Sequence, residues 1–383
     1  MDEAQLIKKR EKFFSKTLPK IYKRGIKRPV LKNKVIFVCG YGKRRFENFD
    51  YLKYYLEKKG GYDIHIYSLK TRIDNERSAA DAKKLVADMA DASLIFTDKA
   101  SEVLSALDIR KETALIHLWN DTGVFKNISN TQNDSIADDR QTYGNIDILS
   151  CCDEKFSKTI REGLAIKDDG VVCPLGISRS DAYLDKSFIE ESYKKFYSIF
   201  QNAQGKKIIY YAPMSRKRQG EFKFPSRFSI QFMHYVFKDD YVIAISRDRL
   251  SLPPRTIQEK YYDFAKDITG QMTSTQMLSI CDIFITDYSP LVFDAAFAAK
   301  PTIMFQYDAH RYKDRMNTFL NFDEYSIGPI CECNEDIVNY IKDNENDFDI
   351  SSLLRFKEKY MSACDGHSTE RIIDRALEIL NER

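Results

Sequence analysis

The chain has 383 residues, enough for two domains of ordinary size, each with its own hydrophobic core. Charged residues make up 31% and hydrophobic residues 43%, a globular balance, and a formal net charge of +3 gives no reason to expect a nucleic-acid partner. We find no run of about 18 apolar residues and no apolar signal-peptide core, so we exclude a membrane-spanning helix and expect a cytoplasmic protein.

Residues 1–34 form a basic amphipathic arm. They hold twelve Lys or Arg against three Asp or Glu, an excess of nine, with apolar residues interleaved at roughly helical spacing. Pro19 is expected to kink or end this helix. Two interpretations stay open. The arm binds an anionic membrane surface peripherally, at about 1 kcal/mol per basic residue near the headgroups, or it packs on the body of the protein.

From residue 35 onward, short apolar runs alternate with amphipathic segments. The predicted strands are 35–39, 64–69, 94–97, 114–118, 146–150 and 170–173. The predicted helices are 49–59, 79–89, 101–107 and 153–164. This alternation predicts a parallel, doubly wound sheet, and we assign residues 35–185 to a first Rossmann-like domain. The eight cysteines show no paired metal-ligand spacing, so we expect buried thiols.

A second series of the same kind follows residues 201–205, where we expect a hinge between the halves. Its predicted strands are 207–211, 241–245, 283–286 and 301–305. Its predicted helices are 274–280, 291–299, 334–342 and 353–360. We assign residues 186–366 to a second Rossmann-like domain. A last helix at 367–383, with Ser368 as its N-cap, is expected to cross back to the first domain.

The clearest local signal lies in residues 280–305, which read as strand, turn, helix and strand. Ser289 is suited to the N-cap and Pro290 to the first helical position. The free amides of that first turn would then face outward and attract phosphate. A plain turn between a strand and a helix, with a capping serine, explains the same residues.

Five segments, in this order, resemble motifs of the CDP-glycerol glycerophosphotransferase family, the teichoic-acid and capsule polymerases. They are LWNDTGVFKNI (118–128), PLGISRSDAYL (174–184), YAPMSR (211–216), DIFITDYSPLVFD (282–294) and CDGHSTER (364–371). The resemblance implies an α/β protein of the GT-B fold, with two Rossmann-like doubly wound domains facing an interdomain cleft. In that family the turn after the DIFIT strand holds the diphosphate of the donor.

The resemblance also implies where the ligands bind. The donor-binding candidates are Ser215, Arg216, Arg247, Asp248, Thr273, Ser274, Asp287, Tyr288 and Ser289. The candidates for the acceptor and phosphate side are Thr122, Gly123, Lys126 and Arg179. An arginine suits the planar, bidentate recognition of phosphate. No acidic metal motif is evident, and we expect neither a metal nor a cofactor.

Both family histidines are replaced in this chain. Asn120 stands at one position and Asp248, within one residue, at the other. Asparagine cannot accept a proton at neutral pH, and general-base catalysis typically contributes 10²–10⁴ in rate. The catalytic candidates are therefore Asn120 and its neighbour Asp121, which can act as the base. His117 is expected to be a core or edge histidine.

The resemblance implies a transferase that moves a glycerol-phosphate or related alditol-phosphate unit from a CDP-linked donor to a cell-surface glycan or lipid-linked acceptor. The acceptor hydroxyl attacks the β-phosphorus of the donor, and CMP leaves. Two alternatives remain open at this point. The chain is a GT-B glycosyltransferase that uses a nucleotide sugar, or a catalytically inactive homologue that kept nucleotide binding.

Overall fold

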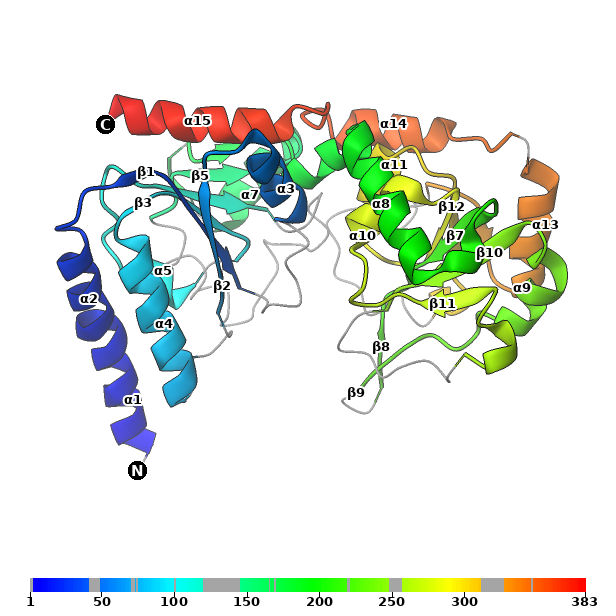
Figure 1. Cartoon of the computed structure of the whole chain (residues 1–383), viewed down its shortest axis with the longest axis horizontal. Coiled ribbons are helices and arrows are strands. Elements are labelled where there is room, and N and C mark those ends of the chain that lie inside the picture. The colour runs from blue at the N-terminus through cyan, green and yellow to red at the C-terminus, as the bar shows by residue number, and fades with distance from the viewer. Residues whose placement is uncertain are drawn as a thin grey trace. The chain divides into compact units, whose positions relative to one another are not determined.

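The computed structural model describes residues 3–40, 49–69, 73, 75–99, 101–119, 145–164, 166–168, 170–218, 221–247, 257–310, 327–345 and 347–383. These residues form two compact units (Figure 1). The first unit holds the residues before 120, those from 145 to 179 and Ala363–Arg383, and the second holds Ser180–Ser362. This division falls a few residues before the domain limits expected at 185 and 366.

The first unit is built on a six-stranded parallel sheet with the order β2-β1-β3-β4-β5-β6. Its strands are β1 (Leu31–Cys39), β2 (Asp63–Ser68), β3 (Ala92–Thr97), β4 (Ala114–Leu118), β5 (Ile148–Ser150) and β6 (Val172–Cys173). Its helices include α3 (Asp50–Lys59), α4 (Glu76–Met89), α5 (Glu102–Ser105), α7 (Glu154–Leu164) and α15 (Ser368–Glu382). Ile372 and Ala376 of α15 share one hydrophobic core with Val35 and Phe37 of β1, so the last helix completes this unit.

The second unit has a six-stranded parallel sheet with the order β11-β10-β7-β12-β13-β14. Its strands are β7 (Lys207–Tyr211), β10 (Tyr241–Ile245), β11 (Ala265–Asp267), β12 (Ile283–Thr286), β13 (Thr302–Phe305) and β14 (Ile330–Cys331), and β8 (Arg216–Arg218) pairs antiparallel with β9 (Glu221–Lys223). Its helices include α8 (Lys186–Ile199), α9 (Ile230–Phe237), α10 (Ser274–Ile280), α11 (Leu291–Phe297), α13 (Asn334–Asn344) and α14 (Ser351–Tyr360). Numbered from β7, the order is 3-2-1-4-5-6, and the strand order reverses between β7 and β12. Ligands of open α/β sheets bind outside the carboxyl ends of the strands at such a reversal.

The amino-terminal arm is helical from α1 (Glu3–Lys12) through a π-helical turn (Phe13–Thr17) to α2 (Leu18–Gly25). The helix does not end at Pro19, which lies in the first turn of α2, where a missing N–H is tolerated. Instead, the helix changes to a π-helical turn just before Pro19, and the Leu18 N–H donates a hydrogen bond to the Phe13 carbonyl at the end of that turn. The predicted break is therefore a change of helix type.

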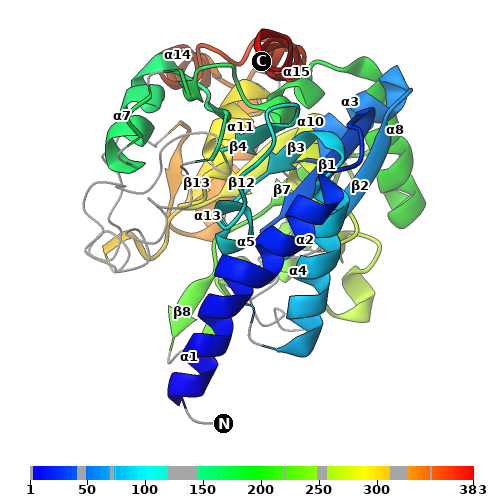
Figure 2. The same ribbon diagram turned by 90° about the vertical axis from the view of Figure 1, so that its left-hand side faces the viewer.

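One face of α2 packs against α4, and the two helices lie side by side in both views (Figures 1 and 2). Leu18 and Tyr22 are buried there. Packing on the body is thus confirmed for this part of the arm. On α1, in contrast, Lys8, Lys9 and Lys12 are exposed. In the arm, α2 thus packs on the body of the first unit, whereas these lysines of α1 face solvent.

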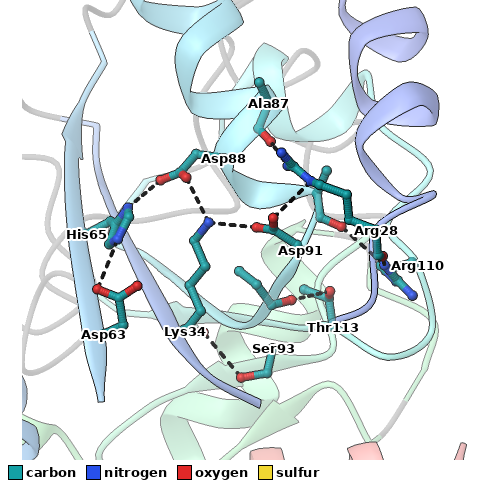
Figure 3. Close-up of polar contacts among 12 residues, drawn as sticks. Arg28, Lys34, Asp63, His65, Ala87, Asp88, Asp91, Ser93, Arg110 and Thr113 are labelled. Carbon is teal, nitrogen blue, oxygen red and sulfur yellow. Dashed lines mark hydrogen bonds and ion pairs between the residues drawn. The ribbon is translucent and has the colours of Figure 1, made fainter. Parts of the chain in front are cut away.

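A buried polar network fixes the segment after α2 to the amino ends of the central strands (Figure 3). The ammonium of Lys34, a residue only 4% exposed, donates to Asp88 at 2.7 Å and to Asp91 at 2.6 Å. Arg28 pairs with Asp91 at 3.0 Å, and the His65 ring contacts Asp88 at 2.5 Å. Burial disfavours the charge on Lys34, but the two carboxylates raise its pKa above the ordinary value.

The cysteines are free thiols, and six of the eight are buried, as the sequence suggested. Cys173 is half-buried and Cys333 is exposed, which the expectation of buried thiols did not anticipate. None of the described helices combines the length and apolar composition that a bilayer-spanning segment needs. Among the residues that the structure describes, no three His, Cys, Asp or Glu side chains gather as a metal site.

Candidate functional site

The turn after β12 lies at the strand-order reversal of the second sheet, but its helix-start amides are not open. The Ser289 hydroxyl accepts from the Leu291 N–H at 3.3 Å, and the carbonyls of Ser289 and Pro290 accept from Val292 and Phe293. The helix begins at Leu291 with Pro290 as its N-cap, so the prediction of Ser289 as N-cap was one residue early. The expectation of free outward amides was wrong, because the turn satisfies these three itself.

Asp287 joins this turn to the segment after β7. The residue is 1% exposed, and its Oδ1 accepts from the backbone N–H groups of Met214 at 2.8 Å and Tyr288 at 2.6 Å. Its Oδ2 lies 2.8 Å from Nη1 of Arg216. Burial raises the pKa of Asp287, and the Arg216 charge and the two N–H groups act against that rise. The carboxylate is thus held from two sides by backbone.

Arg216 lies between two carboxylates. Its Nε and Nη2 donate to Asp308 at 2.8 and 3.0 Å in a bidentate pair, and its Nη1 donates to the Met214 carbonyl at 2.7 Å. The guanidinium also lies over the rings of Tyr288 and Tyr307, 5.1 and 5.8 Å from the ring centres. Although burial opposes its charge, the flanking carboxylates raise the pKa of Arg216, which is therefore a permanent cation.

The sequence missed Asp308 as the partner of Arg216. Asp308 follows β13, the next strand beyond β12, so the two parallel strands deliver it and Asp287 to the same edge of the sheet. The Tyr288 hydroxyl donates to its Oδ1 at 3.2 Å. Burial alone would raise the pKa of Asp308, but the bonds and charge of Arg216 hold it below the ordinary value.

The other donor-side candidates have partners elsewhere on the second unit. Arg247 pairs with Asp267 at 3.1 Å. Thr273 is the N-cap of α10 and forms a capping box with Gln276. Ser274 accepts a long hydrogen bond from the Tyr210 hydroxyl at 3.4 Å. Ser215 is partly exposed in the segment that leads to Arg216.

On the first unit, the structure describes two of the residues singled out from the sequence. Arg179 is buried, 8% exposed, at the end of the segment after β6. His117 is buried within β4, and burial lowers its pKa to about 3, so it is a neutral core histidine, as expected. The other candidates lie outside the described residues, namely Asn120, Asp121, Thr122, Gly123, Lys126 and Asp248.

The described candidates thus fall into one cluster and several separate positions. Arg216, Asp287, Tyr288 and Asp308 meet at the carboxyl ends of β7, β12 and β13. A buried, permanently charged guanidinium with two aromatic faces and a bidentate N–H edge is suited to a phosphate or carboxylate group. The arrangement therefore defines a candidate anion-binding site in the second unit.

Solved structures give the fold class of this protein. Several structures of the wall teichoic acid polymerase TagF match 100% of this chain and 99% of theirs, with TM-scores of 0.75 and 0.76 in two examples and 17% sequence identity. With the two parallel sheets described above, this likeness shows the GT-B fold. Identity this low carries the fold and nothing further.

Sequence comparison then gives the family. The profile of the CDP-Glycerol:Poly(glycerophosphate) glycerophosphotransferase family matches residues 20–378, and the chain belongs to that family. It is 24% identical over 356 residues to a teichoic acid poly(ribitol-phosphate) polymerase of Bacillus spizizenii, covering 90% of this chain and 56% of the relative. It is 26% identical over 312 residues to a teichoic acid glycerol-phosphate primase of Bacillus subtilis, covering 78% of this chain and 77% of the relative. The chain thus spans just over half the length of the first of these relatives.

Proposed function

We propose that the chain transfers an alditol-phosphate unit, glycerol phosphate or ribitol phosphate, from a CDP-linked donor to a glycan or lipid-linked acceptor of a teichoic-acid-like or capsule polymer. The match of the family profile to residues 20–378 carries this proposal. The names of the relatives support both alditols, and one solved structure of a TagF variant was obtained with CDPG after a 15-minute soak. The anion-binding cluster around Arg216 fits a donor that carries a diphosphate.

The proposed reaction is phosphoryl transfer. The acceptor hydroxyl attacks the β-phosphorus, its proton passes to a base, and the bond to the CMP oxygen breaks, so that CMP leaves with the electron pair. Catalysis of this kind rests on positioning and on neutralisation of charge. We assign the charge on the donor phosphates to Arg216 and Arg247, and the base to Asp121 beside Asn120.

The acceptor side is assigned to Thr122, Gly123, Lys126 and Arg179. Two variants test the roles. Asp121→Asn should lower turnover by 10²–10⁴, the usual contribution of a general base, and unchanged turnover would remove that assignment. Arg216→Met should weaken donor binding by about tenfold or more, since a charge-assisted bidentate contact is lost. Lys207→Met, which breaks an exposed ion pair on the same unit, serves as its control.

Donor screening separates this function from its alternatives. The protein is incubated with CDP-glycerol, CDP-ribitol and a panel of UDP- and GDP-sugars, each with a polyol-phosphate primer, and the released nucleotide is measured. Release of CMP from the CDP-alditols alone supports the proposal. Release of UDP or GDP would replace it with sugar transfer. A melting temperature raised by CDP, without turnover of any donor, would indicate a homologue that only binds nucleotide.

We also infer that α1 binds an anionic membrane surface peripherally. Its exposed lysines, with Ile7 54% exposed among them, support this assignment. Changing Lys8, Lys9 and Lys12 to Gln should weaken the free energy of binding to phosphatidylglycerol vesicles by about 3 kcal/mol. In a co-sedimentation assay this is a decrease of roughly a hundredfold in the partition coefficient. The control changes three exposed lysines of the second unit, Lys186, Lys194 and Lys238. Equal binding of the two variants would refute the assignment.

A further inference from the structure

The edge of Arg216 that is best shaped for a phosphate is already occupied. Its Nε and Nη2 hold both oxygens of Asp308, at 2.8 and 3.0 Å. Two parallel N–H groups of a guanidinium bind a carboxylate and a phosphate in the same way. A donor phosphate and the Asp308 carboxylate therefore compete for one pair of hydrogen bonds, and they cannot hold it together.

The two carboxylates around Arg216 are held differently. Asp287 is fixed by the backbone N–H groups of Met214 and Tyr288, and its side chain is 2% exposed. The hydrogen bonds that Asp308 receives from other residues come from side chains, those of Arg216 and Tyr288, and its own side chain is 16% exposed. Asp308 can therefore rotate toward solvent at the cost of side-chain contacts, whereas movement of Asp287 would break backbone contacts of the turn.

Charge makes the exchange necessary. With Asp308 ionised, as its lowered pKa indicates, this carboxylate already matches the single cation of Arg216. The carboxyl group of Asp287, whose pKa burial raises, lies 2.8 Å from Nη1 of the same guanidinium. A diphosphate brought to this cluster would add further negative charge next to both. Like charges repel strongly where water is scarce, so a phosphate gains from Arg216 only after one carboxylate has moved away.

We propose that Asp308 is an internal counter-ion of the donor site, which the donor phosphate displaces from Arg216. The proposal rests on the function assigned above and adds the residue that sets the affinity of the site. In the exchange, two N–H···O contacts to the carboxylate break, two to phosphate oxygens form, and Asp308 turns toward water. No covalent bond changes. Because Asp308 competes, the apparent dissociation constant of a phosphate ligand exceeds the intrinsic one by the inverse of the fraction of molecules with Arg216 available.

The test compares Asp308→Asn with a matched control. Asparagine keeps the shape and one acceptor oxygen but removes the charge. Glu345 provides the control, since it too contacts a cation and a tyrosine hydroxyl in the same unit, Lys207 at 3.2 Å and Tyr241 at 3.0 Å. By calorimetric titration we expect Asp308→Asn to bind inorganic pyrophosphate and CDP at least tenfold more tightly than the wild type. Glu345→Gln should bind them as the wild type does, and cytidine, which is uncharged, should not distinguish the variants.

Several results would overturn the proposal. Unchanged or weaker pyrophosphate binding by Asp308→Asn would mean that Asp308 merely orients Arg216. A gain for cytidine as large as for CDP would point to a general change in the protein. The gain must also vanish in the double variant Arg216→Met/Asp308→Asn. If Asp308→Asn does not fold, Tyr288→Phe removes one contact that holds Asp308, and the absence of any gain there would count equally against the exchange.

Pyrophosphate separates this proposal from the function on which it rests. If Asp308→Asn gains affinity for pyrophosphate while no CDP-alditol is turned over, the counter-ion stands and the assigned reaction falls. If CDP-glycerol or CDP-ribitol is turned over but the affinities of wild type and variant agree, the reaction stands and the counter-ion falls.

Discussion

Replacing Lys34 by methionine should destabilise the first unit by about 3 kcal/mol. Lys34 is 4% exposed, and its ammonium is the shared partner of Asp88 and Asp91, at 2.7 and 2.6 Å. Removing one partner of a buried ion pair typically costs 3–5 kcal/mol, because the remaining charge stays buried. The lower end applies here, since Asp88 keeps His65 and Asp91 keeps Arg28. A domain has only about 5–15 kcal/mol of stability to lose.

The chain offers a probe that reports on this unit alone. Trp119 is its only tryptophan, and it belongs to the first unit. Urea unfolding followed by tryptophan fluorescence should therefore give the free energy of the unit that contains Lys34. Lys53→Met is the control, because Lys53 and Glu57 form an exposed pair one helical turn apart, typically worth 0.3–0.5 kcal/mol. A loss below about 1 kcal/mol for Lys34→Met, similar to the control, would refute the account of a buried charge network.

Three further predictions follow from single positions. Gly176→Ala should lower the free energy of unfolding in the tryptophan assay by about 1–3 kcal/mol, because φ is +91° and a Cβ would lie 2.2 Å from the Ser368 hydroxyl. Gly60→Ala is the control: φ is +73° but the space around it is open, so the loss should be smaller. Thr273→Ala should lower the free energy of unfolding, measured by scanning calorimetry, by about 1 kcal/mol, since it removes the N-cap of α10. Burial acts to raise the pKa of Asp88, but hydrogen bonds, that of Lys34 foremost, lower it below the unfolded value near 3.8. The ionised Asp88 carboxylate therefore stabilises the fold above that value, and this stabilisation is lost as pH falls through the lower pKa of the folded state. Asp88→Asn should therefore flatten part of the acid dependence of unfolding.

The regular elements could be predicted because each is specified locally. The sequence placed four strands and one helix with the bounds that the structure has, namely β4, β7, β10, β12 and α10. Each of these strands is a short apolar run between polar segments, which is the pattern of a strand covered on both faces. The strands β5 and β6 are shorter than predicted, because their register with the neighbouring strands begins only at Ile148 and Val172.

The sequence predicted that these helices exist, but it predicted their N-cap residues less accurately. Ser289 and Ser368 are both good capping residues, yet the N-caps are Pro290 and His367. Ser368 is fully buried, and its hydroxyl lies against Gly176, so packing rather than capping accounts for its place. A residue type indicates that a helix begins nearby, whereas the exact cap depends on backbone dihedral angles that tertiary contacts set.

The candidate site combines residues that only the sheet order brings together. The motif YAPMSR identified Arg216, but its bidentate partner Asp308 is 92 residues away along the chain and lies in no motif. The order of the strands in the sheet predicts this contact. In a 3-2-1-4-5-6 sheet the carboxyl ends of the first, fourth and fifth strands are neighbours, and these are β7, β12 and β13. Acidic residues shortly after the fifth strand are therefore the ones to examine when an arginine follows the first. Asp308 meets that condition, and its effect on ligand affinity decides whether Arg216 is available to a donor or only stabilises the fold.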